Sequence, residues 1–593
     1  MKRSTQHNND LYHFGPFCLD GQERVLLREG RVVPLPAKAL RTLLMLVLSG
    51  GHLVEKDALM KEVWPEEFVE EANLAQHIFI LRRALGETAE NPKYIETIPR
   101  RGYRFIAAVR EDSAAAPPED SAPITRQDLN DRLVDIQSIA VLPFETLGAE
   151  TQDKYLGLGL ADALITKLSR LKRLIVRPTS AVRNVSKHDA VATGRALKVD
   201  SVLEGTIQKS GEHIRVRVQL AGARDRATLW AEQFDEEFTN IFSIEDSISE
   251  QVVKALAVKL TAEEQERLVR RYTENTEAHQ AYLKGRYFFD KRTQESIAKS
   301  IKYFELSIRT DPAYAIAYAG LAECYCALGT FDLIPPKNSM TRAREAALKA
   351  LSIEPYLAEA HAALGWSLLI DWEWTAVEKE LQLAIELNNN LAIVHQYYAL
   401  YLRHMRRFDE SLAESNKAQE LNPTSASLKA TEGGTLCCAG HYNKAEEELC
   451  RAFELDANNP IAHYWLARIY VQKGMYDAAI KQYERTGDIF GKSLEILAHL
   501  GYVHAISGNR EDARRILNEL EESSKRIYVP PLFRALIYAG LDQKEEAFDW
   551  LERSYQEHDI NLISVAIDPA LEGLHEDPRF TNLLQRTGHM PHL

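Results

Sequence analysis

Amide, imidazole and guanidinium side chains are concentrated in one short stretch of the chain, at helical spacing. The side chains that point away from the apolar stripe of this stretch, or lie on its flanks, are Asn73, Gln76, His77, Phe79, Ile80, Arg82 and Arg83. Amide and guanidinium groups form paired hydrogen bonds with the edges of adenine and guanine, and apolar side chains contact the thymine methyl group. The stretch therefore has the size and chemistry of an element that contacts bases in the major groove of DNA.

A second basic group follows shortly afterwards. The segment YIETIPRRGYRFIAAV predicts two strands joined by a turn, with Arg100 and Arg101 at the tip of the hairpin. Two guanidinium groups at such a tip suit contact with phosphates or with the minor groove. Taken singly, each arginine pair is equally compatible with an ordinary charged helix end or turn. Their order within one short segment favours DNA binding.

Small strands and three helices are expected to position these groups. The segments FGPFCLD, ERVLLREG and RVVPLP predict an antiparallel sheet of three or four strands. Apolar residues between Leu40 and Leu48 form one face of a first helix, and EKDALMKEVW predicts a second helix. The third helix carries the polar groups, and its buried stripe is formed by Leu74, Ile78, Leu81 and Leu85.

Residues 11–108 resemble the winged helix of response-regulator output domains (OmpR/PhoB-like), in the variant found at the head of membrane-bound acid-sensing and virulence activators (CadC/ToxR-like). The strings HIFILRRAL and ETIPRRGYRF carry the resemblance. It implies that bases or phosphates face Gln76, His77, Ile80, Arg82 and Arg83, and that the wing is held against the DNA backbone by Thr97, Arg100 and Arg101. It also implies contact of RNA polymerase with the loop from Trp64 to Glu71. Many relatives carry arginine where this chain has Phe79 and Ile80, so two polar contacts are expected to be missing.

The composition of the whole chain is acidic. There are 72 Lys and Arg against 86 Asp and Glu, with a formal net charge of −14. This balance argues against nucleic acid covering the whole chain and leaves room for a local basic site. The chain has no run of about 18 apolar residues, no secretory signal, and too few cysteines for a disulfide framework. We therefore expect a cytoplasmic protein without contact to a membrane.

A small α/β domain is predicted after a flexible linker. Residues 111–133 are rich in Ala, Pro, Ser and acid, which is typical of a tether. From 134 to 262 strands and helices alternate in mixed order, and this part resembles the N-terminal domain of TolB, a periplasmic β-propeller protein. That resemblance implies a fold but no chemistry. Gly157 and Gly159 hint at a dinucleotide-binding loop, but they fit the start of an amphipathic helix better.

Small residues recur every 34 positions in two registers. The first register contains Gly365, Ala399, Gly433, Ala467, Gly501 and Ala535, and the second contains Val377, Ser411, Ala445, Ala479, Ala513 and Ala547. This period is diagnostic of tetratricopeptide repeats. We expect about eight repeats over 275–560, with an insertion near TFDLIPPKNSM, followed by a C-terminal cap and tail at 561–593. Most aromatic residues of this region, such as Trp366 and Trp465, are expected to be packing residues, while a minority could line a groove that holds a protein or peptide.

The predicted fold class is multidomain α+β: a winged helix-turn-helix at 1–110, a small α/β domain, and an all-α solenoid. We expect a one-component transcription regulator that binds double-stranded DNA, with dimerisation on DNA and repeats that sense a protein or ligand. One alternative is an interaction scaffold with a weak or degenerate DNA-binding domain, and another is a nucleotide-binding or cyclase-accessory middle domain. No GxxxxGK[ST], HExxH, GxSxG or paired CxxC occurs. We therefore predict no enzyme, no catalytic residue, no cofactor and no metal site.

Overall fold

The chain divides into two compact units, Met1–Thr125 and Arg126–Leu593. The computed structural model describes residues 11–589, apart from positions 21–24, 29–30, 34, 36, 64–73, 75–77, 79–80, 83, 86, 88–91, 99–100, 108, 112–135, 148–154, 184–189, 212, 225–227, 238–240, 257–259, 262–263, 266–267, 269–270, 292, 331–335 and 492. The predicted linker after Glu111 lies outside the described residues.

The first unit begins with an antiparallel sheet in the order β4-β3-β2-β1-β8. Its strands are β1 (Leu11–Phe14), β2 (Phe17–Asp20), β3 (Val25–Arg28), β4 (Arg31–Val33) and β8 (Arg110–Glu111). The sequence predicted three or four strands here. The fifth, β8, was missed because two residues are too short to show an alternating pattern.

Helices and a second sheet complete this unit. The helices are α1 (Ala37–Leu48) and α2 (Lys56–Val63), and the sheet has the order β5-β7-β6, with β5 (Leu53–Glu55), β6 (Ile95–Ile98) and β7 (Gly102–Phe105). The core between the sheets contains aromatic rings in edge-on contact, with 5.0 Å between the centroids of Phe14 and Phe105. The hairpin of β6 and β7 is the predicted wing.

The second unit opens with a mixed sheet that has the order β11-β9-β12-β13-β14, and β10 pairs with β12. The strands are β9 (Ser138–Val141), β10 (Glu145–Leu147), β11 (Ile175–Val176), β12 (Ser201–Ser210), β13 (His213–Gly222) and β14 (Thr228–Glu237). The accompanying helices are α5 (Tyr155–Leu168), α6 (Thr179–Val182), α7 (Ala190–Leu197) and α8 (Ile241–Ala255). β9, β11 and β12 run parallel while β12, β13 and β14 run antiparallel, which confirms the predicted α/β class.

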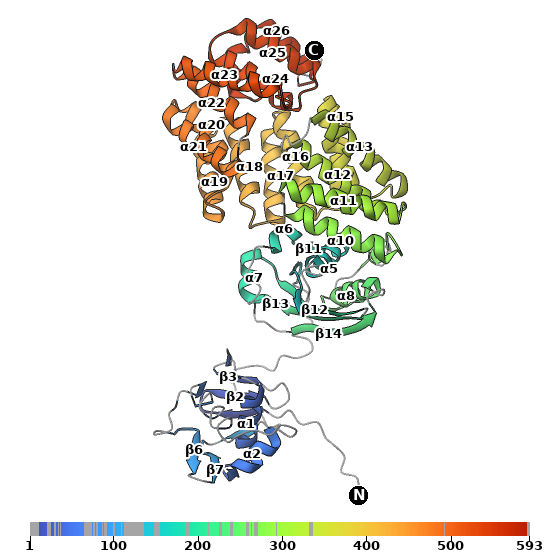
Figure 1. Cartoon of the computed structure of the whole chain (residues 1–593), viewed down its shortest axis with the longest axis vertical. Helices are drawn as coiled ribbons and strands as arrows, with labels where there is room; N and C mark the ends of the chain where they lie inside the picture. Colours follow the sequence, from blue (N-terminus) through green and yellow to red (C-terminus); the bar gives the residue numbers. More distant parts are fainter. Residues whose placement is uncertain are drawn as a thin grey trace. The chain divides into compact units, whose positions relative to one another are not determined.

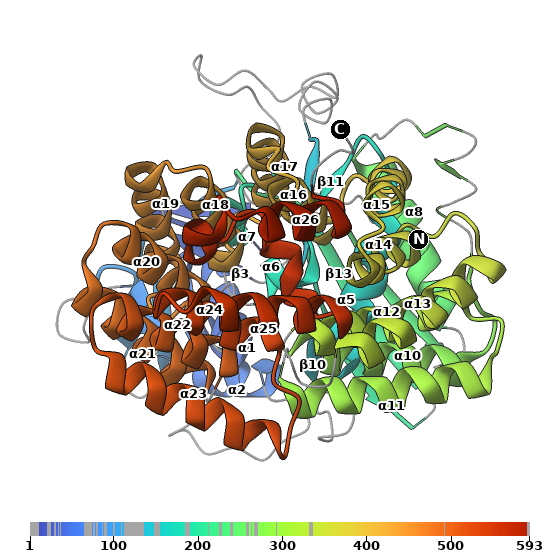
Figure 2. The ribbon, with the colours of Figure 1, turned by 90° about the horizontal axis from the view of Figure 1, so that it is seen from above.

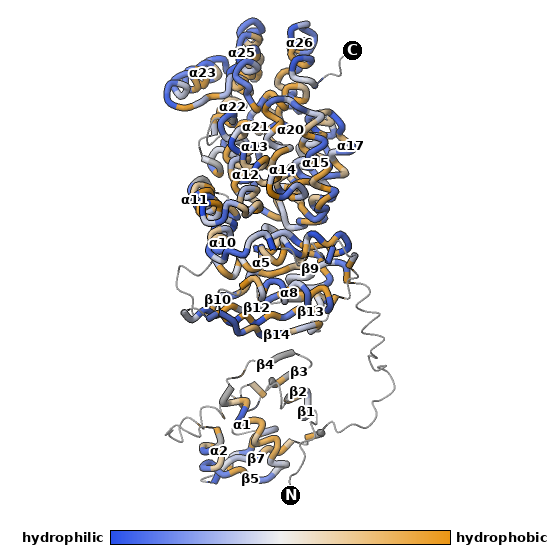
Figure 3. Tube along the Cα trace, turned by 90° about the vertical axis from the view of Figure 1, so that its right-hand side faces the viewer, coloured by the Kyte–Doolittle hydropathy of each residue, from blue (hydrophilic) through white to orange (hydrophobic). Residues whose placement is uncertain are grey.

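The helices that follow alternate as pairs along the chain (Figure 1). They are α10 (Thr276–Asp290), α11 (Gln294–Thr310), α12 (Ala315–Thr330), α13 (Pro336–Ile353), α14 (Ala358–Leu368), α15 (Trp374–Leu387), α16 (Ala392–His404), α17 (Phe408–Leu421), α18 (Ala426–Cys438), α19 (Tyr442–Leu455), α20 (Pro460–Gln472), α21 (Tyr476–Phe490), α22 (Leu494–Ile506), α23 (Arg510–Ser524), α24 (Pro531–Gly540) and α25 (Lys544–Gln556), with the 3-10 turn η3 (Leu369–Asp371) between α14 and α15. Figure 3 shows hydrophobic and hydrophilic residues alternating along these helices. The all-α solenoid that the repeat period predicted is confirmed.

The small residues of the two registers lie where paired helices cross. Ser411 and Ala445 are fully buried, and a Cβ added to Gly433 would lie 2.8 Å from the side chain of Leu449. Ser411 also donates a hydrogen bond of 2.7 Å to the carbonyl of Ala399 on the paired helix. Larger residues at these positions would separate the helices, which explains the 34-residue spacing.

The small α/β domain packs directly on the solenoid (Figure 1). A single cluster of buried hydrophobic residues includes Ile139 of the middle domain and Leu402 of the solenoid. Gly159 brings α5 close to α10, since an added Cβ would lie 3.0 Å from Leu283. Gly157 and Gly159 therefore lie inside a helix and serve close packing. The middle domain and the solenoid form a single folded body.

Two turns of the solenoid reach back to this domain, and they are one repeat apart. Between α15 and α16, Asn390 accepts from the Val176 amide and donates to the carbonyls of Ser169 (2.8 Å) and Leu174 (2.9 Å). Between α17 and α18, Asn422 donates to the hydroxyl of Ser180. The joint is thus built from buried hydrogen bonds as well as apolar contacts.

The chain after the last helix pair returns to the earlier repeats. We call residues 557–589 the closing segment; it contains η4 (Ile560–Ser564), η5 (Pro569–Leu574) and α26 (Pro578–Arg586). Trp374 donates to the Thr587 carbonyl at 2.7 Å, and the Trp372 ring stacks on His558. Figure 2, in which the molecule is seen from above, shows α24 next to α25, the helix pair that the closing segment follows. The closing segment therefore connects the last repeats with the repeat of α14 and α15.

Candidate nucleic-acid interface

The third helix presents its apolar stripe to the core as predicted. Leu74, Ile78, Leu81 and Leu85 are all at most 4% exposed. Because helical positions repeat at about 100° per residue, burial of these four positions fits the predicted amphipathic helix. The predicted contacts Asn73, Gln76, His77, Ile80 and Arg83 lie outside the described residues, as does the loop from Trp64 to Glu71.

Arg82 lies on the inner side of the third helix and is 9% exposed. Its guanidinium donates at 2.8 Å both to the Ile95 carbonyl and to the Thr97 hydroxyl on β6. The resemblance implied that Arg82 and Thr97 face the DNA. The structure brings these two residues together, where they link the third helix to the wing, and it leaves Thr97 exposed.

Glu87 completes this link, and the sequence analysis missed it. Its carboxylate accepts hydrogen bonds from three consecutive backbone amides, those of Lys93 (2.6 Å), Tyr94 (2.6 Å) and Ile95 (3.0 Å). One of its oxygens lies 3.9 Å from Nε of Arg82. Charge-assisted hydrogen bonds of this kind hold a loop strongly. They were missed because no periodic pattern in the sequence predicts them. Glu87 and Arg82 together set where the wing begins.

The wing hairpin depends on a glycine and presents an arginine. Strand β7 pairs with both β5 and β6, and a Cβ on Gly102 would lie 2.0 Å from the carbonyl oxygen of Val54. Only glycine permits this approach. Arg101, next to it, is exposed, while Arg100 lies outside the described residues. The exposed arginine is at the hairpin tip, where contact with phosphate was predicted.

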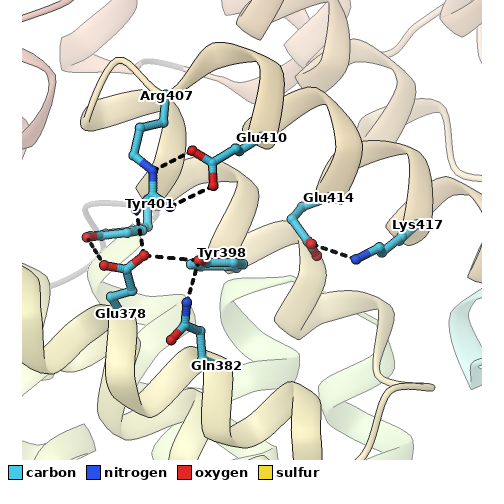
Figure 4. Close-up of polar contacts among 8 residues, drawn as sticks. All are labelled: Glu378, Gln382, Tyr398, Tyr401, Arg407, Glu410, Glu414 and Lys417. Atoms are coloured by element: carbon cyan, nitrogen blue, oxygen red, sulfur yellow. Dashed lines mark hydrogen bonds and ion pairs between the residues drawn. The ribbon is translucent and has the colours of Figure 1, made fainter.

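Polar groups of the solenoid mostly satisfy one another. Figure 4 shows Glu378 on α15 accepting from the hydroxyls of Tyr398 (3.0 Å) and Tyr401 (3.2 Å) and pairing with Arg407. Burial, reinforced by the carboxylate of Glu378, raises the pKa of both tyrosines. A carboxylate with three partners has little capacity left for a ligand. This cluster fastens α15, α16 and α17 together.

The aromatic residues of the solenoid are chiefly packing residues, as predicted. Trp366, Trp374 and Trp465 are 5–8% exposed, and the Trp366 ring stacks on Tyr397. Among the residues that the structure describes, no helix has the length and apolar character to cross a membrane. Within the same residues, no three His, Cys, Asp or Glu side chains are grouped as metal ligands.

Comparison with known proteins covers nearly the whole chain. Residues 30–105 match the family "Transcriptional regulatory protein, C terminal", and residues 135–251 match the family "HilA/YgeH-like transcriptional regulator, second domain". The chain is 25% identical over 532 residues to the transcriptional regulator HilA of Salmonella typhimurium, a match that spans 88% of this chain and 90% of HilA. The chain is homologous to bacterial transcriptional regulators.

Two further relatives match shorter parts. The transcriptional activator CadC of Escherichia coli is 27% identical over 125 residues, which is 20% of this chain and 24% of CadC. A protein of Rhizobium meliloti that is named as an adenylate cyclase is 31% identical over 187 residues, or 31% of this chain and 32% of that protein. The relatives that span most of the chain are regulators, and the likeness to the cyclase is confined to about a third of each protein.

The repeats also match known families. Residues 438–492 match a tetratricopeptide repeat. Among solved structures, PilF of Pseudomonas aeruginosa is 22% identical over 35% of this chain and 92% of its own, with a TM-score of 0.27. Human IFIT1 is 17% identical over 58% of this chain and 78% of its own, with a TM-score of 0.37. Superpositions this loose carry no argument about ligands.

Proposed function

We propose that the chain is a one-component transcription regulator of the cytoplasm that binds specific sites in double-stranded DNA. The observation that carries the proposal is the first unit: two small sheets, a third helix whose apolar stripe is buried, and a wing hairpin with the exposed Arg101 at its tip. The third helix would enter the major groove with Gln76, His77, Ile80 and Arg83, flanked by Asn73. Arg100 and Arg101 would contact the backbone from the wing.

Arg82 and Thr97 have a different part in this proposal. Because both are engaged with each other, they set the distance between the third helix and the wing, and so the spacing between major-groove and wing contacts. Arg82→Met should therefore weaken binding to all sequences through a displaced wing.

The solenoid and the middle domain would sense a protein or ligand and act on DNA binding. We further propose that the regulator works as a dimer on paired half-sites, that the loop from Trp64 to Glu71 contacts RNA polymerase, and that the chain has no enzymatic activity of its own. The middle domain matches a family of regulator domains, which favours regulation over nucleotide chemistry.

The test is a selection from a random double-stranded DNA library at near-physiological salt, with residues 1–112 and with the full chain in parallel. We expect enrichment of a half-site, repeated at about one helical turn if two copies bind side by side. If neither protein enriches any sequence, the proposal fails, and an interaction scaffold with a degenerate winged helix becomes the better account.

A further inference from the structure

Two arginines lie close together on the first helices of two repeats that are separated by one further repeat. Arg403 ends α16 and Arg468 lies in α20, and both guanidinium groups lie over the Trp465 ring, at 5.1 and 5.3 Å from its centroid. Gly434 of α18 makes room for this ring, since an added Cβ would lie 2.3 Å from it. The tryptophan therefore forms a flat support beneath two positive charges.

The two arginines differ in their partners. Arg468 binds the carboxylate of Asp568, which belongs to the closing segment, at 2.8 Å, and also donates to the Tyr464 hydroxyl. Burial disfavours both charged forms, but the attraction between the two charges outweighs this effect. The pKa of Arg468 is therefore raised well above its usual value, and the pKa of Asp568 is lowered. Arg468 is therefore a satisfied ion-pair partner.

Arg403 has no such partner among the residues that the structure describes. It is 8% exposed, its Nε is buried without a hydrogen bond, and in the described part of the chain no carboxylate or carbonyl accepts from its guanidinium. Burial, with Arg468 nearby, lowers the pKa of Arg403. A buried guanidinium that lacks a counter-ion is costly, and proteins retain such a group where a ligand supplies the missing charge.

We propose that Arg403, Arg468 and Trp465 form a binding site for the carboxylate of an acidic peptide. The closing segment already places one carboxylate here, that of Asp568 in the sequence Ile567-Asp568-Pro569-Ala570-Leu571. An acidic peptide would occupy Arg403 and compete with Asp568 for Arg468. The site gives a chemistry to the sensing role proposed above and rests on that role, but its test involves no DNA, so either can fail alone.

The competition also couples binding to the closing segment. Asp568 is held by its ion pair with Arg468 and by a hydrogen bond of 3.0 Å from the Ala570 amide, and the same segment contacts Trp374 at the start of α15. A peptide that displaces Asp568 weakens this closure. Ligand binding and the opening of the closing segment are therefore linked.

The experiment measures binding of the acetylated, amidated peptide IDPAL to the full chain by calorimetry, with the asparagine version INPAL as the control probe. We expect saturable binding of IDPAL only. Affinity should rise about tenfold in Asp568→Asn, which removes the internal competitor, and fall at least tenfold in Arg403→Met. The control variant Arg451→Met removes an exposed guanidinium of α19 that pairs with Glu448 and should bind as the parent does.

Stability separates a binding role of Arg403 from a structural one. If the guanidinium awaits a ligand, Arg403→Met removes an unpaired buried charge and should raise Tm of the free chain by about 1–3 °C. A lower Tm together with unchanged IDPAL binding would show that Arg403 merely packs on Trp465, and the proposal would fail. It would also fail if Asp568→Asn bound no IDPAL at millimolar concentration, or if inorganic phosphate but not IDPAL bound in an Arg403-dependent way.

Discussion

The joint between the middle domain and the solenoid allows a quantitative prediction at Asn390. Its side chain is 7% exposed and serves the Val176 amide and the carbonyls of Ser169 and Leu174. Asn390→Ala leaves these three buried groups without their partner. At about 1–3 kcal/mol for each, reduced by relaxation and water entry, we expect a loss of about 2–4 kcal/mol in the free energy of unfolding.

Asn390→Asp tests the same reasoning more severely. It replaces the donating amide by a second carboxylate oxygen that faces two carbonyls, so the loss at pH 7 should exceed that of the alanine variant. The matched control is Asn389→Ala in the same turn, because Asn389 is exposed and its variant should stay within about 0.5 kcal/mol of the parent.

The assay is urea unfolding of the full chain, followed by circular dichroism, together with hydrogen exchange at the Val176 amide. We expect both Asn390 variants to lower the urea midpoint and to speed exchange in β11, because middle domain and solenoid share one core. Equal midpoints for Asn390→Ala and Asn389→Ala, with unchanged exchange, would refute the claim that the two parts form one body.

Three further predictions concern the DNA-binding unit and pH. Gly102→Ala should disrupt the pairing of β5 with β7, since the new Cβ would lie 2.0 Å from a carbonyl oxygen; thermal unfolding and DNA binding of residues 1–112 should both deteriorate. Arg83→Ala should cost about 1–3 kcal/mol at the selected site only, whereas Arg101→Ala should weaken all sequences alike and flatten the salt dependence, as titrations at several salt concentrations will show. Burial, aided by Arg468, lowers the pKa of His499 to about 3. Below about pH 6.5 the His499 imidazole therefore takes up a proton in the unfolded chain but not in the folded one, so the free energy of unfolding should fall by about 2 kcal/mol between pH 6.5 and 5. Urea unfolding at several pH values should show a smaller fall in His499→Gln.

The sequence was sufficient for the features that follow a regular pattern. The 34-residue spacing predicted the repeats because close helix crossings need small side chains such as Ala445. The leucine stripe of the third helix followed from its period and is buried as expected. Patterns of this kind are local, so one sequence contains them in full.

Contacts between distant segments could not be predicted in this way. Nothing in the period of the third helix shows that Arg82 turns inward to Thr97, because that direction depends on where β6 lies. The pairing of Arg468 with Asp568, a hundred residues later, depends on the return of the closing segment. Such contacts depend on the tertiary structure, and they cannot be predicted from the composition of the sequence or the spacing of its residues.

Closure of the repeats has a consequence for biosynthesis. In an open array of repeats each unit contacts only its neighbours, so the array can fold from one end as it emerges from the ribosome. Here the partners of Trp372 and Trp374 are His558 and Thr587, which follow about two hundred residues later in the chain. The early repeats therefore leave the ribosome with an exposed aromatic edge, which is covered only after the closing segment has been synthesised. Chains that terminate before residue 557 would keep that edge exposed and become substrates for chaperones and proteases.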